Sequence, residues 1–310
     1  MLDRVFAIAL NTYRESLRAR ILIGLTVVAF AVAFYSIIVG AFTLRQSARV
    51  VSDLGVASIS LFGLAVAIII GATSLQRELE QKTLFPILAR PIRRGEYLIG
   101  KYLGTLLTIA VFVFADTGLL LLITAGIGGR SLELTIGVGV AIVVALAVGA
   151  WRVPSLRTYG FIPWSIVLLV VGIALAGVAP VERRVLLVGG ALALLEVGIV
   201  AAWATFFSSF STPFLSALFT VGMLVIGRNA DNLMRLPKKF FPAFLVDGGK
   251  LLSKLVPNLQ IYVPARPLLT GEVSDVNLGM YLGWAGVNAV AWGVGLLAVS
   301  AFIFRRRDFL

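Results

Sequence analysis

Long runs of apolar residues, separated by short polar segments, dominate the pattern along this chain. Several of them continue for about 20 residues, the length that an α-helix needs to cross a bilayer. The runs lie near residues 21–42, 56–75, 102–126, 134–150, 162–179, 185–207, 213–227 and 280–304. We therefore predict an all-α, multi-pass membrane protein, a helical bundle of about 6–8 transmembrane helices.

Some of these runs leave their topology open. The run at 134–150 contains Gly137, Gly139 and Gly149, and the run at 213–227 is short. Either could be re-entrant, and whether 134–150 and 162–179 are true spans is open at this point. Eight crossings would place both termini on the same side of the membrane.

In the N-terminal segment 1–20, apolar residues do not form a continuous run but recur among polar ones. Apolar side chains recur there at helical spacing (Leu2, Phe6, Ala9, Tyr13 and Leu17), whereas Arg4, Asn11, Glu15 and Arg18 fall on another face. This pattern predicts an amphipathic interfacial helix that lies along the membrane surface before the chain turns inward.

Basic residues are distributed unevenly between the ends of the apolar runs. One side carries Arg4, Arg14, Arg18, Arg20, Arg77, Lys82, Arg90, Arg93, Arg94, Lys101, Arg152, Arg157, Arg305, Arg306 and Arg307. The short loops of the other side carry only Arg45, Arg49, Arg130, Arg183 and Arg184. The positive-inside rule therefore predicts that both termini are cytoplasmic, at the cell (inner) membrane.

Composition narrows the chemistry. The 310 residues are 59% hydrophobic and 14% charged, and Cys and His are both missing. Thiol nucleophiles, disulfides and imidazole chemistry are thereby excluded. The phosphate-binding pattern G-x-x-x-x-G-K-[ST] is also missing, since "GGKLLS" at 248–253 lacks its first glycine. We predict no enzymatic activity, no cofactor and no metal site for this chain.

The net charge of +12 could indicate a nucleic-acid partner. In a membrane protein, topology and attraction to anionic lipid are sufficient to account for it. We therefore expect the lipid bilayer, and no nucleic acid, as the partner of the basic residues.

A polar stretch, "RELEQKTLFPILARPIRRGEYLIGK", interrupts the apolar pattern at 77–101. Its charged start leads into an apolar patch that includes Phe85 and Leu88. Pro91 then blocks helix continuation, Gly95 permits a reversal, and Glu96 favours the start of the next helix. The pattern predicts a short, stiff cytoplasmic helix that docks a partner; the alternative is an ordinary positive-inside loop.

The same stretch resembles the cytoplasmic loop of ABC-2-type transporter permeases. The similarity lies in "E-x-E-x-x-T-L" at 78–84 and "ARPIRRGEYLIGK" at 89–101, with matching residues Glu80, Thr83, Pro91, Arg94, Tyr97, Gly100 and Lys101. The surface helix, "LLEVGIVAAWATFFSSFSTP" at 194–213 and the closing "FRRRDFL" agree with it. The family usually has six spans, and 132–180 looks like two extra ones.

The resemblance implies a single transmembrane domain over 1–310 that pairs with a second permease subunit; a homodimer is expected, and a heterodimer is the alternative. It also implies a separately encoded ABC ATPase dimer that binds ATP and Mg and holds the coupling loop 76–101. The coupling residues would be Glu78, Glu80, Thr83, Phe85, Leu88, Pro91, Arg93, Arg94 and Lys101.

Two acidic residues lie near the centres of apolar runs, where a charge costs about 2.5–3.5 kcal/mol. Asp116 and Glu196 are therefore candidates for a translocation path. The alternative is that they are protonated or hydrogen-bonded carboxyls that hold helices together.

The segment 228–279 is too long for a simple connection. Its prolines and its apolar residues at helical spacing predict short helices that rest on the outer leaflet, or a docking surface for an external partner.

Three classes of function follow from the sequence. The leading one is the permease subunit of an ATP-driven exporter. The second is a secondary transporter or channel that uses Asp116 and Glu196. The third is a membrane module that transmits ATPase motion to an external partner without moving a solute.

Overall fold

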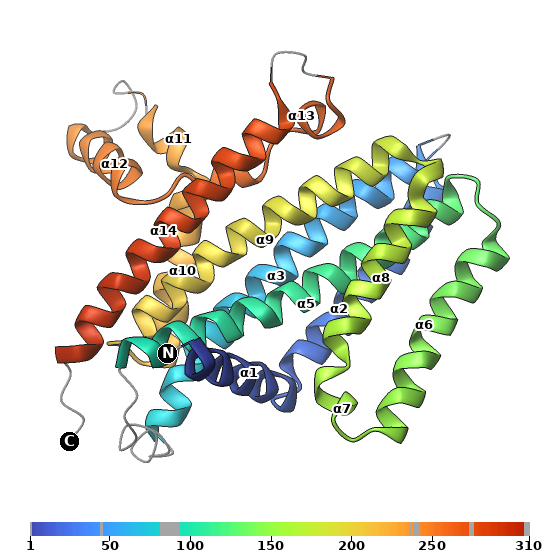
Figure 1. Cartoon of the computed structure of the whole chain (residues 1–310). Helices are drawn as coiled ribbons and strands as arrows, with labels where there is room; N and C mark the ends of the chain where they lie inside the picture. Colours follow the sequence, from blue (N-terminus) through green and yellow to red (C-terminus); the bar gives the residue numbers. More distant parts are fainter. Residues whose placement is uncertain are drawn as a thin grey trace.

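The computed structural model describes residues 2–43, 46–80, 94–235, 237, 242–272 and 276–306, and over this part of the chain it contains helices and no strand (Figure 1). The elements are α1 (Leu2–Arg18), α2 (Ile21–Ala41), α3 (Ser47–Glu80), α5 (Arg94–Ile127), α6 (Leu132–Arg152), α7 (Leu156–Tyr159), α8 (Phe161–Leu175), η1 (Ala176–Val178), α9 (Pro180–Ser208), α10 (Pro213–Arg228), α11 (Ala230–Met234), α12 (Ala243–Leu255), η2 (Leu259–Tyr262), α13 (Arg266–Thr270) and α14 (Leu278–Arg306). The predicted all-α fold is confirmed.

Seven of the described helices are long and apolar enough to cross a membrane, judged by length and composition. They are α2, α3, α5, α6, α8 with η1, α9 and α14, so the two runs within 132–180 both form helices of this kind. The run at 213–227 becomes α10, which has 16 residues. The chain is a multi-pass membrane protein.

The core of the bundle lies where α3, α5 and α9 meet. In α9, 78% of the most apolar 18-residue window is buried inside the protein. Small residues bring the helices together, because a Cβ on Gly71 would lie 2.5 Å from Ala204 Cβ, and one on Gly189 would lie 2.6 Å from Val56. Close approach through small residues is the usual way in which membrane helices associate.

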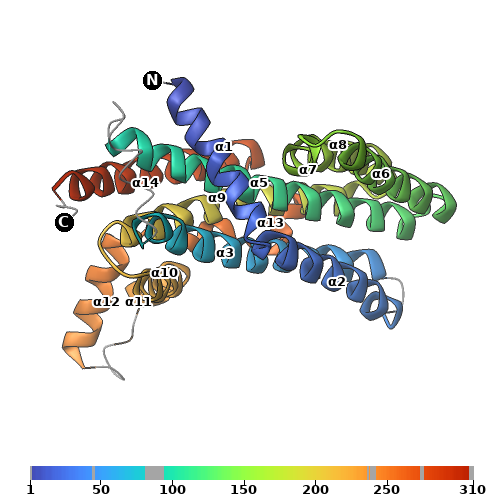
Figure 2. The ribbon, with the colours of Figure 1, turned by 90° about the horizontal axis from the view of Figure 1, so that it is seen from below.

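The α6–α8 hairpin lies at the edge of this core. In Figure 2, α6 and α8 lie on one side of α5, and α2 lies on the other. α8 packs closely on α5, since a Cβ on Gly172 would lie 2.8 Å from the carbonyl oxygen of Gly118. α6 is the outermost helix, and only 6% of its apolar window is buried. At the base of the hairpin, a Cβ on Gly128 would lie 3.0 Å from Ala179 Cβ.

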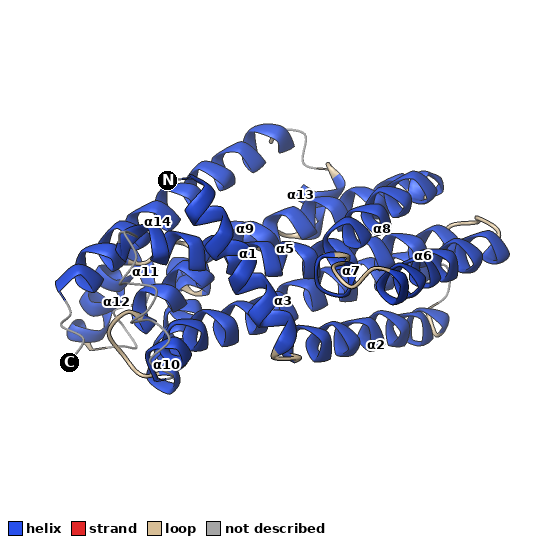
Figure 3. Cartoon of the chain, turned by 60° about the horizontal axis from the view of Figure 1, so that its bottom comes forward, coloured by secondary structure: helices blue, strands red, loops and turns tan. Residues whose placement is uncertain are grey.

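Helix α1 crosses the end of the bundle that also holds the end of α14 (Figures 1 and 3). Its face with Ala9, Tyr13 and Leu17 is buried inside the protein, whereas Leu2 and Phe6 on the same apolar face remain exposed. The amphipathic helix therefore packs against the bundle itself, chiefly against α5.

The segment after α10 rises along the bundle in short pieces. α10 ends at Arg228, which contacts Glu196 near the middle of α9. Gly227 then packs against Leu259 of η2, and the Tyr262 hydroxyl donates to the Ala285 carbonyl of α14 at 3.0 Å. α10 thus pairs with only part of α9, and the chain continues beyond it as the short helices α11, α12, η2 and α13.

Candidate functional site

The two stems of the predicted coupling loop are 34-residue helices. α3 ends at Glu80 and α5 begins at Arg94, with Glu96 in its first turn as predicted. The coupling residues Thr83, Phe85, Leu88, Pro91 and Arg93 lie outside the described residues, as do the side chains of Glu78, Glu80 and Arg94.

Lys101, the last predicted coupling residue, connects three helices. Its Nζ lies 3.1 Å from Oε2 of Glu15 on α1 and 3.4 Å from the carbonyl oxygen of Ser74 on α3. The Lys101 side chain is only 4% exposed. A buried lysine is retained in such a place when a carboxylate and a backbone oxygen replace its water.

Two glycines of α5 allow this junction to form. A Cβ on Gly104 would lie 2.5 Å from the Ala9 carbonyl oxygen, and one on Gly100 would lie 2.7 Å from Ile8. Gly100 and Gly104 are four residues apart, a spacing that permits close packing, and their partner is helix α1. α1 and α5 are therefore held close together near the start of α5.

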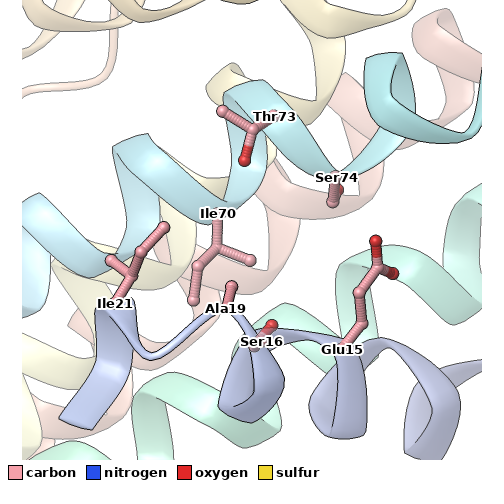
Figure 4. Close-up of a pocket in the computed structure, with 7 residues that line it drawn as sticks. All are labelled: Glu15, Ser16, Ala19, Ile21, Ile70, Thr73 and Ser74. Atoms are coloured by element: carbon pink, nitrogen blue, oxygen red, sulfur yellow. The ribbon is translucent and has the colours of Figure 1, made fainter. Parts of the chain in front are cut away.

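A small cavity of about 20 Å³ lies beside this junction. Figure 4 shows that α1 contributes Glu15 and Ser16 to it and that α3 contributes Ile70, Thr73 and Ser74. A space of this size is enough for a single water molecule between the two helices.

Asp116 is fully buried in α5. Ser58 of α3 donates to its Oδ2 at 3.3 Å, and Oδ1 makes no hydrogen bond with the residues that the structure describes. Asp116 thus contacts α3 but does not line any described cavity.

Glu196 is also fully buried, and it forms an ion pair inside the bundle. Arg228 Nε and Nη2 lie 2.8 and 2.9 Å from its two carboxylate oxygens. The same Nη2 donates to Ser60 Oγ at 2.7 Å, and Ser60 lies 3.3 Å from Oε2 of Glu196. This fork-like geometry satisfies both carboxylate oxygens and links α3, α9 and α10.

The structure does not bring the two acids together. Ser58 and Ser60 are two residues apart on α3, so they point about 200° apart around the helix. Asp116 and Glu196 therefore bond to different sides of α3.

Sequence reasoning missed Arg228. It closes the run at 213–227 and was assigned to the external segment. The sequence did contain a clue to this pair. A carboxylate in the middle of a membrane helix is energetically costly and usually has a cationic partner. Arg228 is the basic residue that ends an adjacent apolar run.

A second ionic cluster lies at the opposite end of the bundle from Lys101. Arg266 of α13 bonds to Asp53 of α3 and, at 2.6 Å, to Glu182 of α9; Ser52 also donates to Glu182 at 2.6 Å. Burial lowers the pKa of Arg266, but the hydrogen bond to Glu182 and the charges of both acids outweigh this effect, so its pKa lies above the ordinary value. The cluster fastens α13 to the ends of α3 and α9.

Among the described residues, no three acidic side chains gather in a way that could hold a metal ion. The polar contacts that stand out are instead between helices: Lys101 at one end, Asp116 and the Glu196–Arg228 pair inside, and Arg266 at the other end.

Comparison with known families identifies the chain. The sequence profile of the ABC-2 family transporter proteins matches residues 6–309. A search of curated proteins finds no match to the chain. Because the profile covers nearly all of the sequence and the structure is an all-helical, multi-pass membrane bundle, the chain belongs to the ABC-2 family of transporter proteins, the membrane permeases of ABC transporters.

Proposed function

We propose that this chain is the permease subunit of an ATP-driven exporter and that a separately encoded ATPase dimer, with its ATP and Mg, drives it through the loop 76–101. The observation that carries the proposal is the Lys101 junction. α1, α3 and α5 are bonded to one another at the foot of that loop. A displacement of the loop is therefore delivered to three helices together.

In this proposal the displacement of the loop travels along α3 and α5, the two helices that continue from it. α3 and α5 continue from the loop through the core and reach Ser58, Asp116 and Ser60 without a break. Rigid helices transmit displacement along their length, and a packed bundle responds by changing between discrete arrangements. The loop end, with both termini, is cytoplasmic in this proposal, and α12 and α13 are external.

We place the translocation path beside Glu196 and Arg228. The Arg228 side chain is 35% exposed on the surface of a single subunit. An arginine next to the middle of α9 is expected to face another protein surface or water rather than lipid. Asp116 has no such opening, so its hydrogen bond to Ser58 supports the helix-holding alternative for that residue.

A second permease subunit would cover the same face. α10 presents an outward stripe at helical spacing (Phe214, Leu218, Val221 and Val225) that ends at Arg228. Two copies that meet along this stripe would enclose both Arg228 side chains, which is how a homodimer would build a polar path between apolar contacts.

The test of the proposal is co-purification and flux with variants of the loop. Phe85→Ala or Leu88→Ala should reduce ATPase retention more than Arg93→Ala does, because apolar anchors carry most of an interface's energy. Pro91→Ala and Lys101→Met should retain the ATPase but lower transport per ATP in liposomes. Unchanged retention and flux in all five variants would contradict the coupling role.

Topology has a separate test, since the chain contains no cysteine. Single cysteines at Arg94 and Ser253 should react with an impermeant reagent from opposite sides of the membrane. Labelling of both from outside would contradict the proposed orientation.

The other two classes of function are distinguished by the same preparations. Transport in liposomes without any ATPase would favour a secondary transporter. ATPase stimulation without flux, together with a retained external protein, would favour a module that transmits motion across the membrane.

A further inference from the structure

The short helix α13 bridges the ends of two core helices. Its first residue, Arg266, bonds to Asp53 near the start of α3 and, at 2.6 Å, to Glu182 in the first turn of α9. Arg266 Nη1 also lies 3.2 Å from Ser52 Oγ. Leu269 of α13 is 6% exposed and belongs to the apolar core of the bundle. An ionic contact at its start and a buried leucine in its middle therefore attach α13 to α3 and α9.

A second arginine holds the other end of α13 from the opposite direction. Arg184 of α9 donates to the Thr270 carbonyl oxygen at 3.5 Å. A Cβ on Gly271 would lie 2.5 Å from Arg184 Nη1, and the φ of Gly271 is +79°, in the left-handed region. Both the space and the backbone conformation at this position therefore require glycine. The guanidinium of α9 covers the end of α13.

The two helices beneath α13 are joined without it. Ser52 of α3 donates to Glu182 of α9 at 2.6 Å. One turn further along, a Cβ on Gly189 would lie 2.6 Å from Val56, so the two helices pack closely there. α13 can therefore leave this surface without any separation of α3 from α9.

The chain on both sides of α13 is anchored separately. Tyr262 of η2 donates to the Ala285 carbonyl oxygen of α14 at 3.0 Å, and Tyr281 of α14 donates to the Ile261 carbonyl oxygen of η2. η2 and α14 are thus bonded directly to each other, and α13 lies in the loop between them. The base of this loop stays closed whether or not α13 contacts the bundle.

The contacts of α13 itself are of a kind that water and salt can replace. The side chain of Asp53 is 48% exposed and that of Arg266 is 17% exposed. Ion pairs with such access to water contribute little to stability and are screened by salt. Arg49 Nε already lies 3.8 Å from the Asp53 carboxylate, so another cation stays beside this acid when Arg266 leaves. A segment with so few buried apolar contacts opens at low cost.

We propose that α13 is a releasable strap. Residues 265–271 detach from α3 and α9 as a unit, while the helices beneath and the base of the loop stay in place. Arg266 and Arg184 are the two clasps of the strap, and a higher ionic strength on that side of the membrane increases its release. Release requires no ATPase and does not depend on the direction of transport.

Single cysteines can report on release, because the chain contains none of its own. The full-length protein in nanodiscs exposes both faces to a water-soluble maleimide. Leu269→Cys is protected while the strap is attached, and Glu272→Cys, at an exposed position just beyond α13, gives the rate of an unprotected thiol. At low salt we expect Leu269→Cys to react about 10–1,000-fold more slowly, as for a minor state populated at about 0.1–10%.

The two clasps have a matched control. Arg266→Gln should speed the labelling of Leu269→Cys about fivefold and remove most of its rise with salt, since the variant lacks both ion pairs. Arg184→Gln should speed it about twofold, because the bond to Thr270 is long. Arg183→Gln should have no effect, since that guanidinium lies near Gly177 instead. Equal rates in Arg183→Gln and Arg184→Gln would overturn the role of the second clasp.

A reporter at the other end of the bundle separates release from general loosening. Ser16→Cys replaces a buried serine of α1 with a side chain of similar size, and its labelling should not change in Arg266→Gln. Equal acceleration of Ser16→Cys and Leu269→Cys would show that the whole bundle loosens. Labelling of Leu269→Cys that responds neither to salt nor to Arg266→Gln would show that α13 is a fixed part of the core. Labelling as fast as that of Glu272→Cys at low salt would show that α13 is not held at all, and each of these three results overturns the strap.

Discussion

Helices α9 and α6 are almost equally apolar, yet they have different positions in the fold. Their most apolar windows have mean hydropathies of 2.4 and 2.3, but 78% of the α9 window is buried inside the protein and 6% of the α6 window. Hydropathy reports the medium that a helix can enter, lipid or protein interior, and these two media are equally apolar.

The difference between the two helices lies in the residues that hydropathy averages out. α9 carries Glu196, which pairs with Arg228, and the small residues Gly189 and Ala204, at which α3 approaches. α6 has glycines too, but a Cβ on Gly137 would meet nothing within 4 Å. Polar pairing and close approach, rather than apolar character, therefore identify the helix that belongs to the core.

The largest expected effect comes from breaking the polar pairing. Glu196→Gln should destabilise the fold by about 3 kcal/mol, because it leaves Arg228 without its carboxylate. Asp116→Asn should cost less, about 1 kcal/mol, since its carboxyl accepts only from Ser58 among the described residues. Unfolding of the purified chain in mixed micelles would measure both.

The double variant Glu196→Gln with Arg228→Gln supplies the control. It removes both charges and should recover part of the stability lost in Glu196→Gln alone. Equal losses in Glu196→Gln and Asp116→Asn would show that the ion pair does not distinguish the core helices.

The next effect comes from close approach. Gly71→Ala should cost about 2 kcal/mol, because the added methyl would lie 2.5 Å from Ala204 Cβ and two helix backbones must separate to admit it. Gly137→Ala on α6 should change stability by no more than about 0.5 kcal/mol. Midpoints of thermal unfolding in detergent check the pair, and similar shifts would contradict the contrast between α9 and α6.

The smallest effect is expected at the ionic cluster of Arg266, Asp53 and Glu182. Arg266→Gln should cost about 1 kcal/mol and less at high salt, since its acidic partners are partly solvated. The raised pKa of Arg266 means that its contribution is fully present at neutral pH and is lost only as the pH rises above the ordinary arginine range. Unfolding at pH 6 and 9 should therefore give the same difference between Arg266→Gln and the native chain, and a marked pH dependence would assign the effect to other groups.

The sequence predicted the positions of the helices well, because the thickness of the bilayer sets the length of an apolar run. It did not predict their neighbours. Gly100 and Gly104 are four residues apart, a spacing that permits close packing, and so are Gly279 and Gly283, but a Cβ on Gly283 would meet nothing within 4 Å. The same spacing faces a helix in one case and open space in the other.

The ionic contacts were less accessible from sequence. Glu196 was recognised by its cost in an apolar run, but Arg228 was not assigned to it, since 32 residues separate them. The Lys101–Glu15 bond joins residues 86 positions apart. Pairing of this kind depends on the tertiary arrangement of helices, which a pattern of local periodicity does not contain.

The contact between Gly128 and Ala179 at the base of the α6–α8 hairpin brings the end of α5 next to the start of α9. Because the hairpin leaves and rejoins the bundle at neighbouring points, α5 and α9 could be connected by a short turn in its absence. In water, removal of the hairpin would expose the apolar face of α5 at a large cost, whereas in a bilayer lipid covers that face. The α6–α8 hairpin therefore has the properties of an insertion into the connection between α5 and α9.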